Sequence, residues 1–342
     1  MDLVTQGLLG AAVGQAGFQK SLGRRALGWG AVIGMLPDLD VIVKVSSNPF
    51  AEILHHRGIT HSLWFGPVVG PLQGYLLWRV YTYKGKQDSL SAWVGLAVWS
   101  LLTHPLLDLF TVYGTQLLAP FSSHRFSIPA VPIIDPFYSL TLLAAVLIGL
   151  CFPARIRTST LSAAVALVLT TGYLFLGWAQ NEKAEYLCRL QLEKEAPNQV
   201  MFKSVRAYTT MFQIFWRRVV VEDELSTRVG FISTWSPKPI QWTTFEHSRD
   251  LPCRYFLKDS KVAIFTWFTS QHYFIHYDPL TAYVTLVDTR FGFPGATALG
   301  LWGIKFPINQ KGERTGPIVK INFPLESMTP QIILDLFAKA FW

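Results

Sequence analysis

Three short motifs in the N-terminal half of the chain carry carboxylates and imidazoles within otherwise apolar sequence. They are Pro37-Asp38-Leu39-Asp40, then His55-His56-Arg57-Gly58-Ile59-Thr60-His61-Ser62, and then Thr103-His104-Pro105-Leu106-Leu107-Asp108. Ionisable groups flanked by apolar runs long enough to span a bilayer are costly to bury, so we expect them to face one another, a metal ion or water. These motifs are therefore the first place to look for chemistry.

His104 and Asp108 are four residues apart. On a helix this spacing places both side chains on one face, where they can bind one ion together. Pro105 removes a backbone donor and tends to kink a helix, which near a membrane surface often opens a polar pocket. The alternative is a histidine hydrogen-bonded to a neighbouring helix, with the aspartate at the water boundary.

Asp38 and Asp40 are two residues apart and follow Pro37, which interrupts a helix. In an extended segment, residues i and i+2 point the same way, so both carboxylates can reach one site. The alternative is that the two aspartates form the solvated end of a helix.

His56 and His61 are off-register for a single helix face, and Gly58 lies between them. This pattern predicts a loop ligand followed by a ligand at a helix start, with Thr60 as the N-cap. Arg57 offers a forked donor for phosphate or carboxylate. The alternative is a polar loop with incidental histidines.

Together the motifs predict a divalent metal site. Imidazole and carboxylate donors without thiolate suit zinc first, and also manganese or iron. A bound ion would acidify a water molecule and polarise a phosphoryl or carbonyl oxygen. Glu52 or one of the aspartates would serve as general base, and Arg57 would bind the substrate. The predicted metal ligands are Asp38, Asp40, His56, His61, His104 and Asp108.

Composition divides the chain near residue 180. Residues 1–180 hold 18 of the 52 Asp, Glu, Lys and Arg, and the shorter remainder holds the rest. The positive mean hydropathy of +0.29, with 12 Trp and 24 Phe, is typical of a membrane protein with aromatic anchors at the interface. The net charge is +8, but there is no run of five or more basic residues, so nucleic acid is not the expected partner.

The three cysteines, Cys151, Cys188 and Cys253, lack any C-x-x-C spacing. A cysteine zinc site or a redox pair is therefore not expected. Cys188 and Cys253 either form one disulfide in an oxidising compartment or remain free buried thiols.

Six apolar segments are expected to position the motifs. They lie near residues 3–19, 26–43, 62–80, 90–110, 137–152 and 159–179, close to the roughly 20 residues that a spanning helix needs. The chain starts without the basic region of a cleaved signal, so the first segment is expected to be retained. Glycines four residues apart in the first three segments predict close helix packing.

The loops between these segments predict the orientation. Eight cations lie in the odd-numbered loops, and three, Lys44, Arg57 and Arg125, lie in the even-numbered loops. The odd-numbered loops are therefore expected to be cytoplasmic. The three motifs, which follow at the other ends of their helices, would then gather at the extracytoplasmic face.

The remainder of the chain is predicted to be a β-rich α+β domain outside the membrane. Runs of β-branched and aromatic residues suggest strands at 213–221, 227–234, 262–269, 273–277 and 282–287. A closing helix is expected over Pro330–Trp342. The predicted domains are 1–180, the polytopic membrane domain with the metal site, and 181–342, the extracytoplasmic domain.

The ordered set of motifs resembles the YdjM-like family of bacterial inner-membrane proteins, which are described as metal-dependent hydrolases. The resemblance covers about residues 1–140 and includes Val4-Thr5-Gln6-Gly7-Leu8-Leu9-Gly10-Ala11-Ala12 and Tyr113-Gly114-Thr115-Gln116-Leu117-Leu118-Ala119-Pro120-Phe121, together with the three motifs above. It implies a multi-pass inner-membrane protein with a bound divalent metal and hydrolase activity. The implied ligands are the six residues already given.

The leading hypothesis is a membrane-embedded metal-dependent hydrolase with its site at the extracytoplasmic face. Its substrate would be lipid-linked, phosphate-bearing or an ester. The competing hypothesis is a non-enzymatic membrane protein with a structural metal site or an ion path, in which the outer domain binds a partner. The bilayer is the one partner that the sequence predicts, and protein partners are not indicated.

Overall fold

The computed structural model describes residues 1–45, 50–152, 154–195, 202–248, 250–251, 254–295, 297–323 and 338–339. The chain divides into two compact units: Met1–Ser47 with His55–Trp178, and Asn48–Leu54 with Ala179–Trp342. Cys253 and most of the closing helix predicted over Pro330–Trp342 lie outside the described residues. Cys188 is a buried free cysteine, and Cys151 is an exposed free cysteine.

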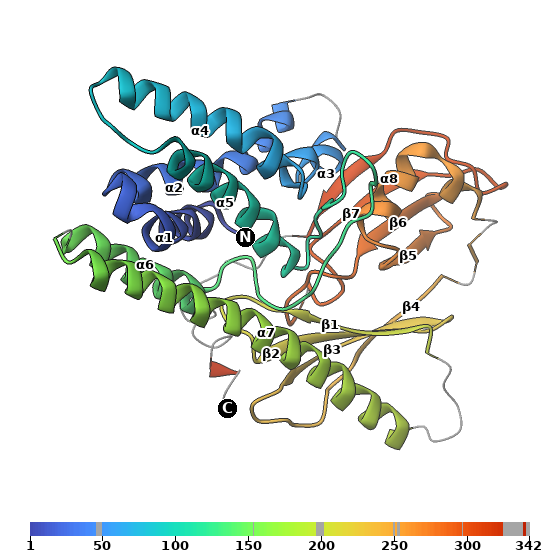
Figure 1. The fold of residues 1–342 in the computed structure, drawn as a ribbon. Coiled ribbons are helices and arrows are strands. Elements are labelled where there is room, and N and C mark those ends of the chain that lie inside the picture. Colours follow the sequence, from blue (N-terminus) through green and yellow to red (C-terminus); the bar gives the residue numbers. More distant parts are fainter. Residues whose placement is uncertain are drawn as a thin grey trace. The chain divides into compact units, whose positions relative to one another are not determined.

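The first unit is helical (Figure 1). Capping residues begin several of its helices: Asp2 caps α1, Ser89 caps α5 and Asp135 caps α6, each accepting a hydrogen bond from a backbone N–H in the first turn. Its elements are α1 (Leu3–Leu22), α2 (Arg25–Met35), the 3₁₀ segments η1 (Leu36–Val45) and η2 (Ile59–His61), α4 (Phe65–Tyr83), α5 (Leu90–Leu109), α6 (Pro136–Cys151) and the start of α7 (Ile156–Glu195).

Glycines bring the helices of this unit into backbone contact, as their spacing predicts. A Cβ on Gly10 of α1 would lie 2.1 Å from the carbonyl oxygen of Gly30 on α2, and one on Gly30 would lie 2.2 Å from that of Gly10. Gly70 and Gly74 of α4 pack in the same way against the backbone of α5. Small residues at these positions let the helix axes approach closely. The core between the helices is apolar and includes Trp93, Leu96 and Leu101 of α5.

The expectation of about six membrane spans is wrong. All six apolar segments form helices, but among the described residues two helices are long and apolar enough to cross a bilayer: α5, with mean hydropathy 1.4, and α7, with 1.7. α6 is apolar but has only 16 residues. The other segments fall short for separate reasons: α2 has 11 residues and gives way to 3₁₀ structure around Pro37, and α1 carries the polar residues Gln6, Gln15 and Gln19.

The second unit is β-rich, as expected. Its described residues form two antiparallel sheets of four strands, in the orders β1-β2-β3-β4 and β5-β6-β7-β8. The C-terminal part of α7 packs on the first sheet, where Ala184, Cys188 and Leu192 meet Val205 and Val219. The strands are β1 (Ser204–Thr209), β2 (Trp216–Glu222), β3 (Ser226–Ser233), β4 (Thr243–Glu246), β5 (Tyr273–Asp278), β6 (Tyr283–Asp288), β7 (Trp302–Pro307) and β8 (Val319–Asn322).

One predicted strand of this unit is a helix. Residues 262–269 were expected to form a strand, but they fall mainly in α8 (Ser260–Phe268), which follows the short η3 (Tyr255–Lys258). Asp259 caps α8 by accepting hydrogen bonds from the backbone N–H groups of Lys261 and Val262. This N-cap outweighs the strand preference of the β-branched and aromatic residues that follow it. The remaining helix, α3, spans Ala51–His55.

Candidate metal centre

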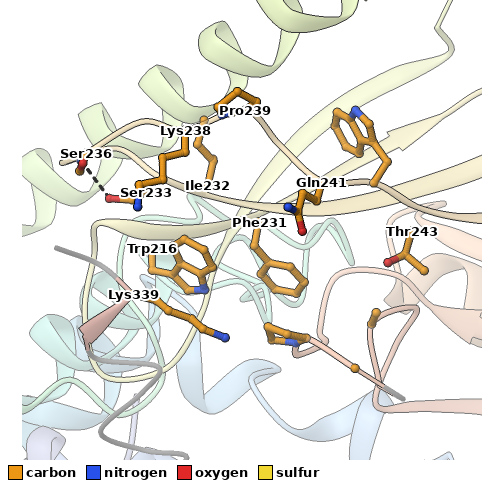
Figure 2. Close-up of a pocket in the computed structure, with 14 residues that line it drawn as sticks. Trp216, Phe231, Ile232, Ser233, Ser236, Lys238, Pro239, Gln241, Thr243 and Lys339 are labelled. Carbon is orange, nitrogen blue, oxygen red and sulfur yellow. Dashed lines mark hydrogen bonds between the residues drawn. The ribbon is translucent and has the colours of Figure 1, made fainter. Parts of the chain in front are cut away.

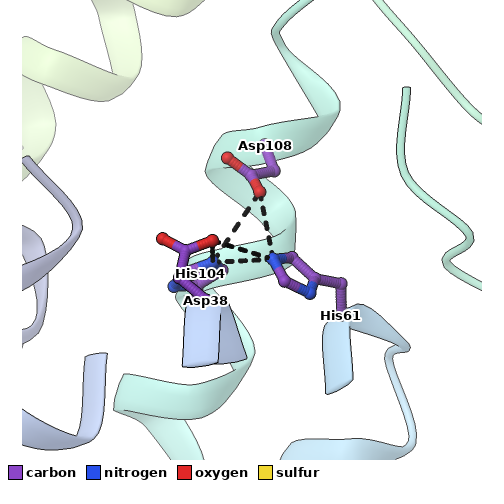
Figure 3. A group of neighbouring side chains, drawn as sticks. All are labelled: Asp38, His61, His104 and Asp108. Carbon is purple, nitrogen blue, oxygen red and sulfur yellow. Dashed lines mark hydrogen bonds and ion pairs between the residues drawn. The ribbon is translucent and has the colours of Figure 1, made fainter. Parts of the chain in front are cut away.

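Four side chains from three separate segments converge in the first unit (Figure 3). Asp38 comes from η1, His61 from η2, and His104 and Asp108 from one face of α5. One ligand atom of each lies within 4.8 Å of the ligand atoms of the others. His104 Nε2 and Asp108 Oδ2, one helical turn apart, are separated by 3.7 Å, and their joint binding of an ion stays a prediction.

Five of the six distances between the ligand atoms are close to those of a tetrahedral ion site, and the sixth, between Asp38 and Asp108, is within 4.8 Å. The two Nε2 atoms of His61 and His104 are 3.0 Å apart. Asp38 Oδ1 lies 3.4 Å from each of these nitrogens, and Asp108 Oδ2 lies 3.4 Å from His61 Nε2. In a tetrahedral zinc site with bonds of about 2.0–2.2 Å, adjacent ligand atoms are about 3.4 Å apart. The side chains are therefore spaced to receive one ion of this kind.

The outer nitrogen of each histidine is already engaged, which leaves Nε2 for the centre. His104 Nδ1 donates to the carbonyl oxygen of Gly34 at 2.6 Å. Thr60 Oγ1 donates to Asp40 at 2.8 Å, so it accepts from His61 Nδ1 at 3.0 Å. With the hydrogens on Nδ1, two neutral rings direct bare Nε2 lone pairs at each other. A cation or a proton must lie between them, and metal-binding histidines are commonly oriented in this way.

Burial makes the group costly without a cation. The side chains of His61, His104 and Asp108 are 0% exposed, and that of Asp38 is 15% exposed. Asp108 Oδ2 is buried without a hydrogen bond among the described residues, although His61 and Arg57 lie within ion-pair distance of it. A buried carboxylate oxygen without a hydrogen bond is destabilising unless a cation compensates it. Because Asp38 is the most exposed of the four side chains, solvent reaches the group from the side of Asp38.

Positive groups surround Asp108. Arg57 Nε lies 3.1 Å from Asp108 Oδ2, and its Nη1 donates to Thr111 at 2.7 Å. The guanidinium also stacks over Tyr113 at 4.8 Å, and Arg57 has a left-handed φ of 60°, which is rare outside glycine. The α-amino group of Met1 pairs with the other oxygen of Asp108.

His61 carries a proton unless a metal ion replaces it. Burial acts to lower its pKa, but the carboxylates of Asp108, Asp38 and Asp40, each within 3.4 Å of a ring nitrogen, outweigh that effect and raise the pKa to about 10. Metal binding at this position must therefore release a proton.

Asp40 and His56 lie beside the four-atom group and not within it. Asp40 Oδ2 is 3.2 Å from His61 Nδ1, and Asp40 Oδ1 is 2.7 Å from His56 Nδ1. The prediction of an extended segment here is wrong, because Asp38 and Asp40 lie in a 3₁₀ helix. With three residues per turn, positions two apart point in different directions. Asp38 therefore faces the centre, while Asp40 holds His61 from behind.

Three further polar residues, Thr60, Glu52 and Gln6, are placed by the structure as follows. Thr60 lies within η2 and bonds Asp40, so it is not the N-cap that was predicted. Glu52 belongs to the second unit, where its Oε2 lies 4.0 Å from Lys320 Nζ. Gln6, which was not among the predicted site residues, donates from Nε2 to Asp108 Oδ1 at 3.0 Å. The signal for Gln6 was available: it is a polar side chain within an apolar helix.

Two known proteins match part of this chain. Inner membrane protein YbcI of Escherichia coli (strain K12) is 34% identical over 129 residues, which cover 37% of this chain and 72% of that protein. Uncharacterized protein YfhP of Bacillus subtilis (strain 168) is 34% identical over 121 residues, and the match spans only 33% of its length. No solved structure matches.

A family model described as YdjM inner membrane protein matches residues 1–184. The match covers more than half of the chain and includes all four side chains of the candidate metal centre. Most of the β-rich unit lies beyond it. The chain thus belongs to the YdjM family of inner membrane proteins.

Proposed function

We propose that this protein is a membrane-embedded metal-dependent hydrolase whose site holds one divalent ion. The observation that carries the proposal is the convergence of Asp38, His61, His104 and Asp108 from three separate segments at tetrahedral spacing. Two imidazoles and two carboxylates without thiolate suit zinc, and also manganese or iron. Asp40 and His56, predicted as ligands, are assigned to the layer behind His61.

The residues around the ion would divide the chemistry between them. When bound, the ion would lower the pKa of a coordinated water and polarise a phosphoryl or carbonyl oxygen. Asp38 is the outward-facing donor, so substrate approaches from its side. Arg57 offsets the charge of Asp108 and offers its guanidinium to an anionic substrate. Of the general bases that the sequence suggested, Asp38 lies on the exposed side of the site, whereas Glu52 belongs to the second unit and is not assigned to it.

A lipid-linked substrate is favoured by an apolar groove of about 590 Å³ in the same unit. Residues of α1, α5, α6 and α7 line it, and α5 contributes Thr103 and Leu107, the neighbours in sequence of His104 and Asp108. A groove between helices of an inner membrane protein is suited to one lipid chain. The tail of a substrate could lie there while its headgroup meets the metal centre on α5.

The distribution of cations favours an extracytoplasmic site. Lys84 and Lys86 precede α5, while Arg155 precedes α7 and Arg157 lies in its first turn. By the positive-inside tendency both candidate spans start in the cytoplasm, and the chain returns between them. The C-terminal end of α5, with Asp108, and the β-rich unit after α7 would then lie outside.

The test is hydrolysis by the purified protein of phosphodiester and carboxyl-ester substrates, each with a short and a long acyl chain, with and without chelator. Chelator-sensitive turnover that is lost in His104→Ala supports the proposal. Gly17→Leu should reduce turnover of long-chain substrates selectively, because no atom lies within 4 Å of a Cβ at Gly17 and the added side chain fills the groove. Gly28→Leu is the matched control, since Gly28 is equally open but does not line the groove.

One observation favours a second candidate function, a structural metal site in a non-enzymatic membrane protein. Four protein donors already complete a tetrahedron, as in structural zinc sites, whereas catalytic sites keep one position open. In that case the ion would be present in stoichiometric amount and its removal would lower the melting temperature, yet no substrate would be turned over. The two functions are thus separated by activity and not by metal content.

A further inference from the structure

The β-rich unit contains a cavity of about 520 Å³ that the proposed hydrolase does not use (Figure 2). One wall comes from β2, β3 and the segment that leads into β4, and the other from the loop around Pro294 and Ala298. Two lysines, Lys238 and Lys339, line it, and none of the lining residues that the structure describes is acidic. The volume lies within the range of small-molecule sites.

The floor of the cavity is aromatic. The rings of Trp216 and Phe231 are nearly parallel, at 11°, with centroids 6.1 Å apart. The strand register sets this arrangement: Trp216 pairs with Ser233 and Arg218 pairs with Phe231, so the two aromatic residues are diagonal neighbours on one face of the sheet. Figure 2 shows the two rings next to each other. Together they form an aromatic surface of two nearly parallel rings.

Two buried indole donors beside this surface have no acceptor in the described part of the chain. The indole Nε1 atoms of Trp216 and Trp242 are both buried without a hydrogen bond among the described residues. Gly230 makes room for this wall, because a Cβ there would lie 2.2 Å from Ile240 Cγ2 and 3.1 Å from Trp242 Cε3.

The opposite wall is held in place by a buried cation. Arg218 Nη2 donates to the carbonyl oxygens of Ala298 at 2.7 Å and Leu299 at 3.0 Å, and Nη1 donates to that of Thr289. These bonds tie the loop of the second sheet to strand β2 of the first. The cavity is therefore a built feature of the unit and not a gap between loose segments.

We propose that this cavity binds an anionic sugar, that is, a hexose carrying phosphate or carboxylate. The C–H face of a sugar ring packs against the negative faces of aromatic rings. The ammonium groups of Lys238 and Lys339 then serve the anionic substituent, and no described lining residue carries a carboxylate that would repel it.

Binding to the full-length protein tests this site, in a detergent without a sugar headgroup so that the detergent does not compete. Titration calorimetry should detect glucose 6-phosphate and glucuronate, with neutral glucose and inorganic phosphate each at least tenfold weaker. Alginate oligosaccharides distinguish a glycan from a free sugar as the ligand. If they bind more tightly than glucuronate, the ligand is a glycan; if they bind equally tightly, it is a free sugar.

Three variants separate the parts of the site. Trp216→Ala should abolish binding, whereas Trp216→Phe keeps the aromatic surface and should weaken binding about tenfold. Lys238→Gln should remove the preference for the charged sugars without affecting glucose. Trp235→Ala and Lys261→Gln are controls, because both residues lie in the same unit but do not line the cavity.

Three results would overturn the proposal. One is the absence of binding by either charged sugar at millimolar concentration. Another is binding of inorganic phosphate or uridine monophosphate as tight as that of the sugars. The third is binding that survives both Trp216→Ala and Lys238→Gln.

Discussion

Asp40→Asn gives the sharpest test of which side chains touch the ion and which only support it. Asp40 accepts from Thr60 Oγ1 and the Arg57 backbone N–H, and approaches His61 Nδ1 at 3.2 Å. Asparagine can keep an oxygen on that side and turn its amide toward His56. The change therefore removes the negative charge behind His61 but leaves the imidazole in place.

The expected loss follows from that geometry. Replacing the partner behind a metal-binding histidine typically costs about 10–100-fold in metal affinity, or about 1.4–2.7 kcal/mol. Removing a direct donor costs more: a structural zinc site is worth about 10–16 kcal/mol over four donors, so one donor carries about 3 kcal/mol or more than 100-fold. Asp40→Asn should thus weaken zinc binding by about 10–100-fold, and His104→Ala by more than 100-fold.

Competition with a zinc-chelating dye at pH 7.5 measures both values. Asp40→Asn should still bind one ion per chain, with a higher Kd. Asp88→Asn is the control, because Asp88 pairs with Arg25 and not with an imidazole. If Asp40→Asn loses zinc as completely as His104→Ala, Asp40 is itself a ligand and the four-atom group is wrongly assigned. Wild-type affinity would show that Asp40 does not orient His61.

Three further predictions follow from the same structure. Zinc affinity should rise about tenfold per pH unit between pH 6 and 9, because the ion displaces the proton of His61 and the pKa of that group is about 10. Calorimetry in buffers of different ionisation enthalpy should detect the release of about one proton, and a pH-independent Kd would contradict the prediction. Gly10→Ala should destabilise the protein by about 3 kcal/mol, because its Cβ would lie 2.1 Å from a carbonyl oxygen of α2; thermal unfolding should show Gly28→Ala unchanged within about 1 kcal/mol. Arg57→Met should leave the buried Asp108 without its nearest side-chain cation and cost about 3 kcal/mol of stability in metal-free protein; equal loss in metal-loaded protein would show that the ion does not share the compensation.

Much of the candidate site was predictable from sequence, because burying an ionisable side chain without a partner is costly in any protein. Buried imidazoles and carboxylates in apolar sequence must find partners, and this alone brought His61, His104 and Asp108 together with Asp38. Helical spacing then fixed the pair on α5. The positions of Asp40 and His56 behind the ligands were harder to predict, because they depend on the 3₁₀ structure of η1, a segment that the sequence suggested to be extended.

The fold, like the site, was predictable in some features and not in others. Glycine spacing predicted the close packing of α1 with α2, since backbone contact leaves room for no larger residue. The number of membrane spans was overestimated because apolar runs were counted without their length as helices, and α2 stops after 11 residues. The strand expected at 262–269 failed because a single cap at Asp259 decided the local structure. Positions set by one capping residue are harder to predict than those set by a repeated pattern.

The central claim is that one divalent ion is held between Asp38, His61, His104 and Asp108. Elemental analysis of the purified wild-type protein and of His104→Ala tests it most directly. We expect one zinc, manganese or iron per wild-type chain and less than a tenth of that in the variant. Wild-type protein without stoichiometric metal after incubation with these ions, or a variant that retains the full amount, would contradict the account.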